Sequence, residues 1–191
     1  MVAYRVMTRR VVVEPHDPRW AQAFDLESSL VARALGPQVV AVHHIGSTAI
    51  PGICAKPVID MLVEVADIAA VDARDADMTA LGYDVLGEFG IAERRYFRKR
   101  DEAGRHTHHG HVFAVSSSEV LRHLAFRDLL IAHQDWAERY SDLKRSLAQA
   151  HPQDIEGYMQ GKGAFIREVD RRAATWAEGG SASGRPEQAV A

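Results

Sequence analysis

The segment 39–45 begins with four apolar residues and ends directly before a glycine and two hydroxyl residues. These are Gly46, Ser47 and Thr48. Glycine lets the backbone approach an anion closely, and Ser and Thr hydroxyl groups add donors beside main-chain N–H groups. Asp60 lies thirteen residues after Ser47, where a carboxylate can hold the Mg²⁺ or Mn²⁺ that accompanies phosphates. These residues predict a site for a polyphosphate and a divalent cation. The alternative for Gly46 and Ser47 is an ordinary β-turn.

Asp60 stands among apolar residues in a segment whose pattern is that of a β-strand. Alternation over residues 58–64 places Asp60, Leu62 and Glu64 on one face and residues 59, 61 and 63 on the other. Burying an isolated charge is very costly, so Asp60 must be paired, protonated, capping or bound to a metal. We predict metal or ligand binding, with a salt bridge to a basic residue as the alternative. Glu64 lies roughly 6–7 Å beyond Leu62 along the strand and is a candidate to reach the metal indirectly.

A histidine-rich strand is predicted over residues 107–115, with His109 and His111 on one face. Histidines in this arrangement can ligate a metal, act as general acid or base, or contact phosphate when protonated. We assign His111 as a candidate general acid or base. His106 and His108 are expected to be solvated loop residues. A zinc or manganese hydrolase built on His109, His111 and Asp60 is a further possibility, although the sequence has no compact metal-spacing motif.

Basic residues crowd the neighbouring predicted strand, 94–100, and Arg98 is the candidate among them for contact with a polyphosphate. The alternative is a solvated edge strand that charge protects against aggregation. Arg127 and Asp128 are expected to form a local ion pair.

The predicted elements alternate between strands and helices in the first part of the chain, and the remainder is helical. We expect strands over 9–14, 39–45, 57–65, 83–87, 94–100 and 107–115, and helices over 17–35, 68–81, 120–133, 135–147 and 154–177. The fold class is therefore α+β: a mixed sheet of about five strands with packed helices, followed by a C-terminal helical hairpin. Residues 1–177 form one domain, and residues 178–191 read as a disordered tail.

Composition excludes several classes of protein. The net charge of −3 over 191 residues gives no bulk attraction to nucleic acid or membrane, and no apolar run is long enough to span a membrane. Neither a secretory signal nor a disulfide is expected, because the N-terminus lacks an apolar run and Cys54 is the single cysteine. Cys54 is expected to be a buried structural thiol. These features indicate a cytoplasmic protein.

Several motifs together resemble the GrpB family (UPF0157) within the nucleotidyltransferase superfamily. They are residues 12–20, 44–52, 56–60, 109–112 and 124–128, together with Tyr158, Lys162, Phe165 and Ile166. The resemblance implies a nucleotidyltransferase-like fold and suggests that Lys56 and Lys162 face the pocket as phosphate ligands. It also implies magnesium-dependent transfer of a nucleotidyl group from a nucleoside triphosphate to an unknown acceptor. Ser47 and Thr48 would hold the phosphates, Asp60 the metal, and Lys56 and Arg98 would neutralise the leaving pyrophosphate.

One departure from that superfamily favours a different function. Active nucleotidyltransferases carry a second carboxylate two positions after the first, and here that position is Leu62. The chain also resembles the accessory domain fused to some bacterial dephospho-CoA kinases. The alternative is therefore a catalytically degenerate module that binds a nucleotide, or a protein partner, without transferase activity.

Overall fold

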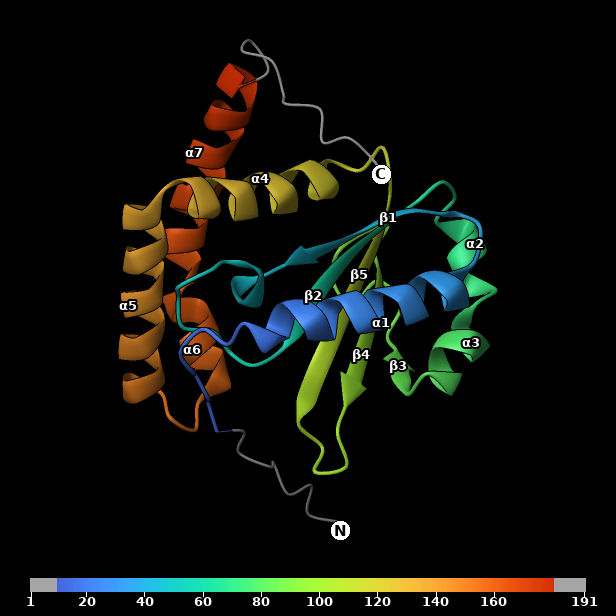
Figure 1. Ribbon diagram of the computed structural model, residues 1–191, viewed down its shortest axis with the longest axis horizontal. Helices are drawn as coiled ribbons and strands as arrows, with labels where there is room; N and C mark the ends of the chain where they lie inside the picture. The colour runs from blue at the N-terminus through green and yellow to red at the C-terminus, as the bar shows by residue number, and fades with distance from the viewer. Residues whose placement is uncertain (1–9, 181–191) are drawn as a thin grey trace.

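The computed structural model describes residues 10–180 and contains one five-stranded sheet in the order β1-β2-β5-β4-β3 (Figure 1). The strands are β1 (Val39–Ile45), β2 (Ile59–Val65), β3 (Tyr83–Val85), β4 (Arg95–Arg100) and β5 (His106–Ala114). Strand β2 pairs antiparallel with β1 and parallel with β5, whereas β4 pairs antiparallel with β5 and β3. The mixed five-stranded sheet predicted from the sequence is confirmed.

The pairing of the two central strands fixes which side chains meet. Asp60 of β2 lies opposite Ile45 of β1 and opposite His109 of β5, and His111 lies beside Tyr96 of β4. Residues in register on neighbouring strands project to the same face of a sheet. The sheet therefore brings the predicted carboxylate and the predicted histidines together, although they are far apart in the sequence.

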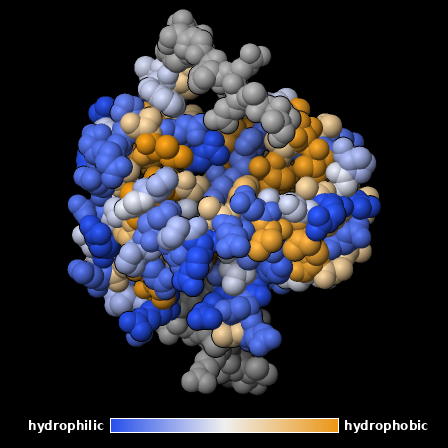
Figure 2. Space-filling model, viewed as in Figure 1, coloured by the Kyte–Doolittle hydropathy of each residue, from blue (hydrophilic) through white to orange (hydrophobic). Residues whose placement is uncertain are grey.

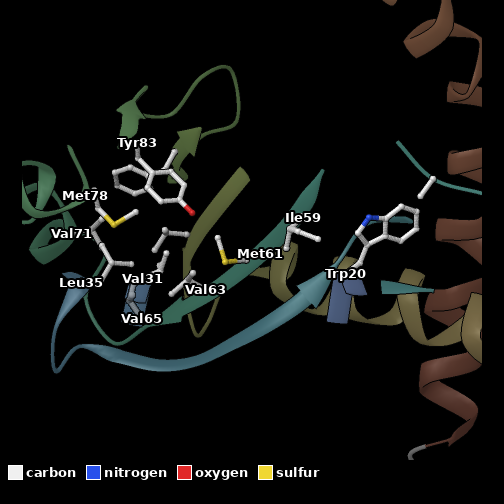
Figure 3. Packing of buried hydrophobic residues seen from close by; sticks show 13 residues of the cluster. Trp20, Val31, Leu35, Ile59, Met61, Val63, Val65, Val71, Met78 and Tyr83 are labelled. Carbon is white, nitrogen blue, oxygen red and sulfur yellow. The ribbon is translucent and has the colours of Figure 1, made fainter. Parts of the chain in front are cut away.

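The main core lies on the other face of the sheet, beneath helix α1 (Arg19–Leu35). Trp20, Val31 and Leu35 of this helix share one buried cluster with Met61 and Val63 of β2. In Figure 3, Val31 and Leu35 lie near Val63, whereas Trp20 lies near Ile59. The short helices α2 (Ala69–Asp72) and α3 (Asp75–Ala80) extend the same layer through Val71 and Met78. Asp60, which alternates with Met61, is thereby directed away from this core.

The C-terminal helices stand at one side of the sheet in Figure 1. They are α4 (Ser118–Ala132), α5 (Gln134–Ala150), α6 (Ile155–Gly161) and α7 (Gly163–Gly180). Val120 of α4 packs on Ile45, Leu62 and Phe113, which belong to the sheet face that carries Asp60. A second cluster joins α4, α5 and α7 to Ile50 and Ile53 in the segment between β1 and β2. The segment that contains Ser47 is thus held between the sheet and the helices.

Three predicted elements differ from those observed. In place of a strand at 9–14, the described part of that segment forms only an isolated bridge between Glu14 and Ala55. The helix predicted over 68–81 is divided into α2 and α3, because Arg74 leaves the helical conformation and its Nε donates to the carbonyl of Ala34 at 2.9 Å.

The last predicted helix is likewise two helices, α6 and α7, which meet at Lys162. At the end of α6, a Cβ on Gly161 would lie 2.4 Å from Cδ2 of Leu147, so the glycine permits close packing on α5. Helix α7 continues to Gly180, three residues beyond the predicted 177, and residues 181–191 of the predicted tail lie outside the described residues.

Hydrophilic residues cover most of the face shown in Figure 2, with apolar patches between them. Within residues 10–180, no helix has the length and apolar character needed to cross a bilayer.

Candidate functional site

Gly46 is required by the position of Asp60. The backbone of Gly46 has φ of +70°, and a Cβ at this position would lie 2.3 Å from Oδ2 of Asp60. Only glycine combines this conformation with so close an approach. The turn begins the short 3₁₀ helix Ser47–Ala49, so Ser47 directly follows the residue whose backbone approaches the Asp60 carboxylate.

Asp60 is held by histidines and not by a guanidinium. Its Oδ1 lies 2.9 Å from Nδ1 of His109 and 3.9 Å from Nε2 of His111, and its side chain is 27% exposed. Burial by itself raises the pKa of Asp60, but hydrogen bonds and charge from the two histidines outweigh burial and hold the pKa well below its usual range. The carboxylate is therefore ionised and available as a ligand at neutral pH.

His109 belongs to a longer histidine network than the sequence suggested. Its Nε2 lies 3.2 Å from Nδ1 of His106, so His106 is part of the cluster and not a solvated loop residue. His108 is also misassigned as a loop residue, because it lies in β5 and is half-buried. Burial lowers the pKa of His108, whose Nδ1 contacts the hydroxyl of Thr107 at 3.0 Å.

Asp60, His109 and His111 form a group that fits a metal ion. One oxygen and two ring nitrogens from these side chains all lie within 4.8 Å of one another. Ligand bonds to a transition metal are about 2.0–2.2 Å long, so one ion can contact all three after small adjustments. Two imidazoles with one carboxylate suit Zn²⁺ or Mn²⁺ better than Mg²⁺, which prefers an all-oxygen shell. The predicted Mg²⁺ is therefore a poorer match to this donor set than the alternative Mn²⁺.

Glu64, the second predicted metal ligand, lies outside this group. Its Oε1 is 2.6 Å from Nε2 of His43 on the neighbouring strand. Leu62 separates Glu64 from Asp60 along β2 and is fully buried at 0% exposure. The other two ligands of the group, His109 and His111, come instead from β5, which alternation along β2 alone does not reveal.

Ser47 and Thr48 have different environments. Thr48 is 2% exposed, and its hydroxyl donates to the carbonyl of Val58 at 3.1 Å and contacts Nε2 of His44 at 3.0 Å. The predicted phosphate donor Thr48 is therefore engaged in holding the segment between β1 and β2. The Ser47 hydroxyl makes no hydrogen bond to another residue of the described chain, and it remains the candidate donor.

Lys162 lies at the join between α6 and α7 and is close enough to Asp60 and Lys56 for charge interaction. Burial lowers its pKa to about 8, the Asp60 carboxylate opposes this shift, and Lys56 adds to it. Its Nζ lies 4.5 Å from the centre of the Tyr158 ring. Lys162 is thus brought toward the carboxylate, and Lys56 is close enough to Lys162 to affect its charge.

Arg98 is directed to another partner. Its guanidinium contacts Oδ2 of Asp84 on β3 at 3.3 Å, although its strand neighbour Tyr96 lies beside His109 and His111. Arg127 forms the predicted ion pair with Asp128 at 2.7 Å and also donates to the carbonyl of His44 at 3.1 Å. Neither arginine contacts Asp60 directly.

Two buried basic residues were missed by the sequence reasoning, Arg94 beside the site and Lys144 in α5. Arg94 is 6% exposed and lies 3.5 Å from Nδ1 of His111, so this guanidinium, which can only donate, faces a ring nitrogen of the cluster. Lys144 is 1% exposed, and its Nζ donates to the carbonyl of Cys54. Neither burial was predicted, because no sequence pattern signals a buried basic residue. Cys54 itself is 5% exposed, which confirms the predicted buried thiol.

The cluster is a partly open site on the sheet. A hollow of about 510 Å³ lies elsewhere, between α5 and α7, and is lined by Leu129, His133, Trp136, Arg171, Thr175 and Trp176, among others. None of the three candidate ligands lines it. The side chains of His109 and His111 are each 16% exposed, so a small ligand can reach them from solvent.

Comparison with known proteins gives matches over most of the chain. A family model described as GrpB protein matches residues 10–172. The UPF0157 protein YqkA of Bacillus subtilis is 44% identical over 90% of this chain and 49% of its own length. The crystal structure of the conserved protein GrpB from Enterococcus faecalis aligns with a TM-score of 0.83 and 39% identity, covering 87% of this chain and 99% of that one.

A dephospho-CoA kinase of Mycolicibacterium paratuberculosis is also similar, with 31% identity over 92% of this chain and 50% of that protein. The chain therefore spans about half the length of two of its relatives, YqkA and the kinase.

Proposed function

The chain belongs to the GrpB family, and on this premise we propose that it binds a transition-metal dication together with the phosphate groups of a nucleotide or another polyphosphate. The observation that carries the proposal is the convergence of Asp60, His109 and His111 within 4.8 Å. In this proposal Mn²⁺ or Zn²⁺ takes the place that the sequence reasoning gave first to Mg²⁺.

The chain's own groups have distinct tasks in this proposal. Asp60 and the two histidines hold the dication, which when bound attracts phosphate oxygens. Ser47 donates its hydroxyl to the phosphate, and Gly46 allows the backbone to approach it. A dication bound to one carboxylate carries only one net positive charge, which leaves most of the negative charge of a polyphosphate uncompensated. Lys56 and Lys162 balance this remaining charge.

Nucleotidyl transfer is the second candidate, and one observation weighs against it. The position that would supply a second carboxylate is Leu62, which is 0% exposed and packs against Ile45 and Phe113. That position therefore cannot hold a second metal ion. Binding without transfer, as in an accessory module, is favoured, and the match to a dephospho-CoA kinase supports a role beside another domain or protein.

Metal binding is tested by titrating Mn²⁺ and Zn²⁺ into the purified protein by calorimetry. Asp60→Asn is expected to lower the affinity by at least the roughly 10–100-fold seen when a ligand's supporting partner is lost. Glu64→Gln is the matched control, because it removes a carboxylate on the same strand face outside the cluster. Equal affinity in the wild type and Asp60→Asn would contradict the proposed site.

Phosphate binding is tested with inorganic tripolyphosphate in the presence of Mn²⁺. Ser47→Ala and Lys162→Met are expected to weaken tripolyphosphate binding without changing Mn²⁺ affinity. Incubation with α-labelled nucleotides and a cell extract then separates the two candidates. Label transfer that disappears in Asp60→Asn supports transferase activity, and saturable binding without transfer supports the module.

A further inference from the structure

The loop between β3 and β4, residues 86–94, has an unusual backbone close to the site. Phe89 has φ of +43° and Glu93 has φ of +61°, which are costly conformations for residues other than glycine. Such strain persists only where surrounding contacts maintain it, and it occurs preferentially at functional sites. Here Arg94 maintains it, because its guanidinium donates to the carbonyl of Phe89 at 2.7 Å and to that of Glu88 at 3.2 Å.

The strained loop presents an aromatic ring to solvent. Phe89 is 60% exposed, and its ring stacks on Tyr96 with 5.3 Å between centroids and an angle of 23° between planes. Tyr96 is 8% exposed and its ring lies 5.1 Å from that of His111. A short series of rings thus leads from the surface to the candidate metal ligands.

Phe89 lies on the same side of the sheet as the site. Ile91 of the loop packs with Leu62 and Phe113, which are on the face that carries Asp60. Arg94 contacts both the Tyr96 ring, at 4.7 Å, and His111, at 3.5 Å, so it connects the loop to the cluster. One face of the Phe89 ring is covered by Tyr96, and the exposure of the residue leaves the opposite face open.

We infer that Phe89 is a stacking platform for a planar aromatic group, a nucleobase, on the ligand whose phosphate oxygens lie at the Asp60 cluster. This inference rests on the proposed function and makes it specific: the ligand is a nucleotide and not an inorganic polyphosphate. Stacking suits an exposed phenyl ring because every base has a π-face, so the platform selects for a base without selecting which base. The backbone strain at Phe89 is then maintained because it holds the ring beside the site.

The test uses ATP and inorganic tripolyphosphate as probes, each titrated with saturating Mn²⁺ into the full chain. Phe89→Gly removes the ring and relieves the strain, since glycine adopts positive φ freely, so the variant is expected to fold. Phe89→Tyr keeps a stacking ring. Leu121→Ala is the control, because Leu121 is another apolar side chain exposed to a similar extent, 69%, on α4.

Phe89→Gly is expected to weaken ATP binding by roughly tenfold or more, with tripolyphosphate binding unchanged. Phe89→Tyr and Leu121→Ala should bind both probes as the wild type does. If Phe89→Gly binds ATP as tightly as the wild type, the platform is refuted and the proposed function remains. If the wild type binds neither probe, the proposed function has failed and this inference fails with it.

Discussion

Gly46 and Asp60 depend on each other at the level of single residues. Replacing Gly46 by alanine would place a methyl group 2.3 Å from the Asp60 carboxylate, in a backbone conformation that alanine resists. The carboxylate would have to move away from His109, with which it now shares a 2.9 Å hydrogen bond. The proposed metal site is thus expected to be sensitive to a residue that would not itself be a ligand.

The first prediction compares Gly46→Ala with Gly104→Ala. Gly104 also has positive φ, +75°, but a Cβ there meets nothing within 4 Å. Both variants should lose about 1 kcal/mol of stability from backbone strain. Gly46→Ala should also lose Mn²⁺ affinity, measured by calorimetry, whereas Gly104→Ala should keep it. Loss of Mn²⁺ affinity in both variants, or in neither, would contradict a specific role of Gly46 in positioning Asp60.

Lys144 provides a second prediction at this scale, from its buried charge. Burial lowers the pKa of Lys144 to about 7, from an ordinary value of 10.5. Between pH 7 and 10.5 the unfolded chain therefore holds a proton that the folded chain lacks. The free energy of unfolding should rise with pH in this window, by at most about 1.4 kcal/mol per pH unit from this residue.

The measurement is urea unfolding of the wild type and Lys144→Met at several values of pH from 6 to 10. The variant should be less stable near pH 10, because the carbonyl of Cys54 loses its donor. Its free energy of unfolding should also rise less steeply with pH, because the contribution of Lys144 is gone. Parallel curves for the two proteins would mean that Lys144 does not titrate in this window.

The strands and their faces were the most predictable elements. Alternation placed Asp60 with Leu62 and Glu64 on one face of β2, and His109 with His111 on one face of β5; the observed pairing of the two strands brings these faces together. Alternation depends only on backbone geometry, so it survives folding unchanged. The hydrogen bond between Glu64 and His43 was not predictable, because it depends on which strand becomes the neighbour of β2.

The helices were less predictable because their ends are set by tertiary contacts. The break at Arg74 follows from its hydrogen bond to Ala34, forty residues away, and the break at Lys162 places that side chain near Asp60. The burial of the basic residues Arg94 and Lys144 was also missed, because burial is set by tertiary packing and leaves no pattern in the sequence.

The third prediction concerns how the segment between β1 and β2 is attached to helix α5. The N–H of Cys54 donates to Oγ of Ser141 at 2.9 Å, across 87 positions of sequence, and both groups are buried. Ser141→Ala would leave this N–H without its acceptor, at a cost of about 1–3 kcal/mol. Ser29→Ala is the control, since its hydroxyl bonds to Asp25 on an exposed helix surface. If Ser141→Ala unfolds at the same urea concentration as the wild type, this attachment is refuted.

At the scale of the whole molecule, the sheet and the C-terminal helices form the site jointly. The sheet supplies the carboxylate and histidines, the β1–β2 segment supplies Ser47, and the helices supply Lys162. The chain covers only about half of two longer relatives, one of them a dephospho-CoA kinase. All of these site residues lie within 10–172, the range that the GrpB family model matches.

The most direct measurement of the central claim is anomalous X-ray diffraction from crystals grown with Mn²⁺. We predict a peak within about 2.0–2.3 Å of Asp60 Oδ1, His109 and His111, with the Asp60–His109 hydrogen bond replaced by bonds to the metal. At saturating Mn²⁺, the absence of a peak there, with that hydrogen bond still intact, would contradict the account.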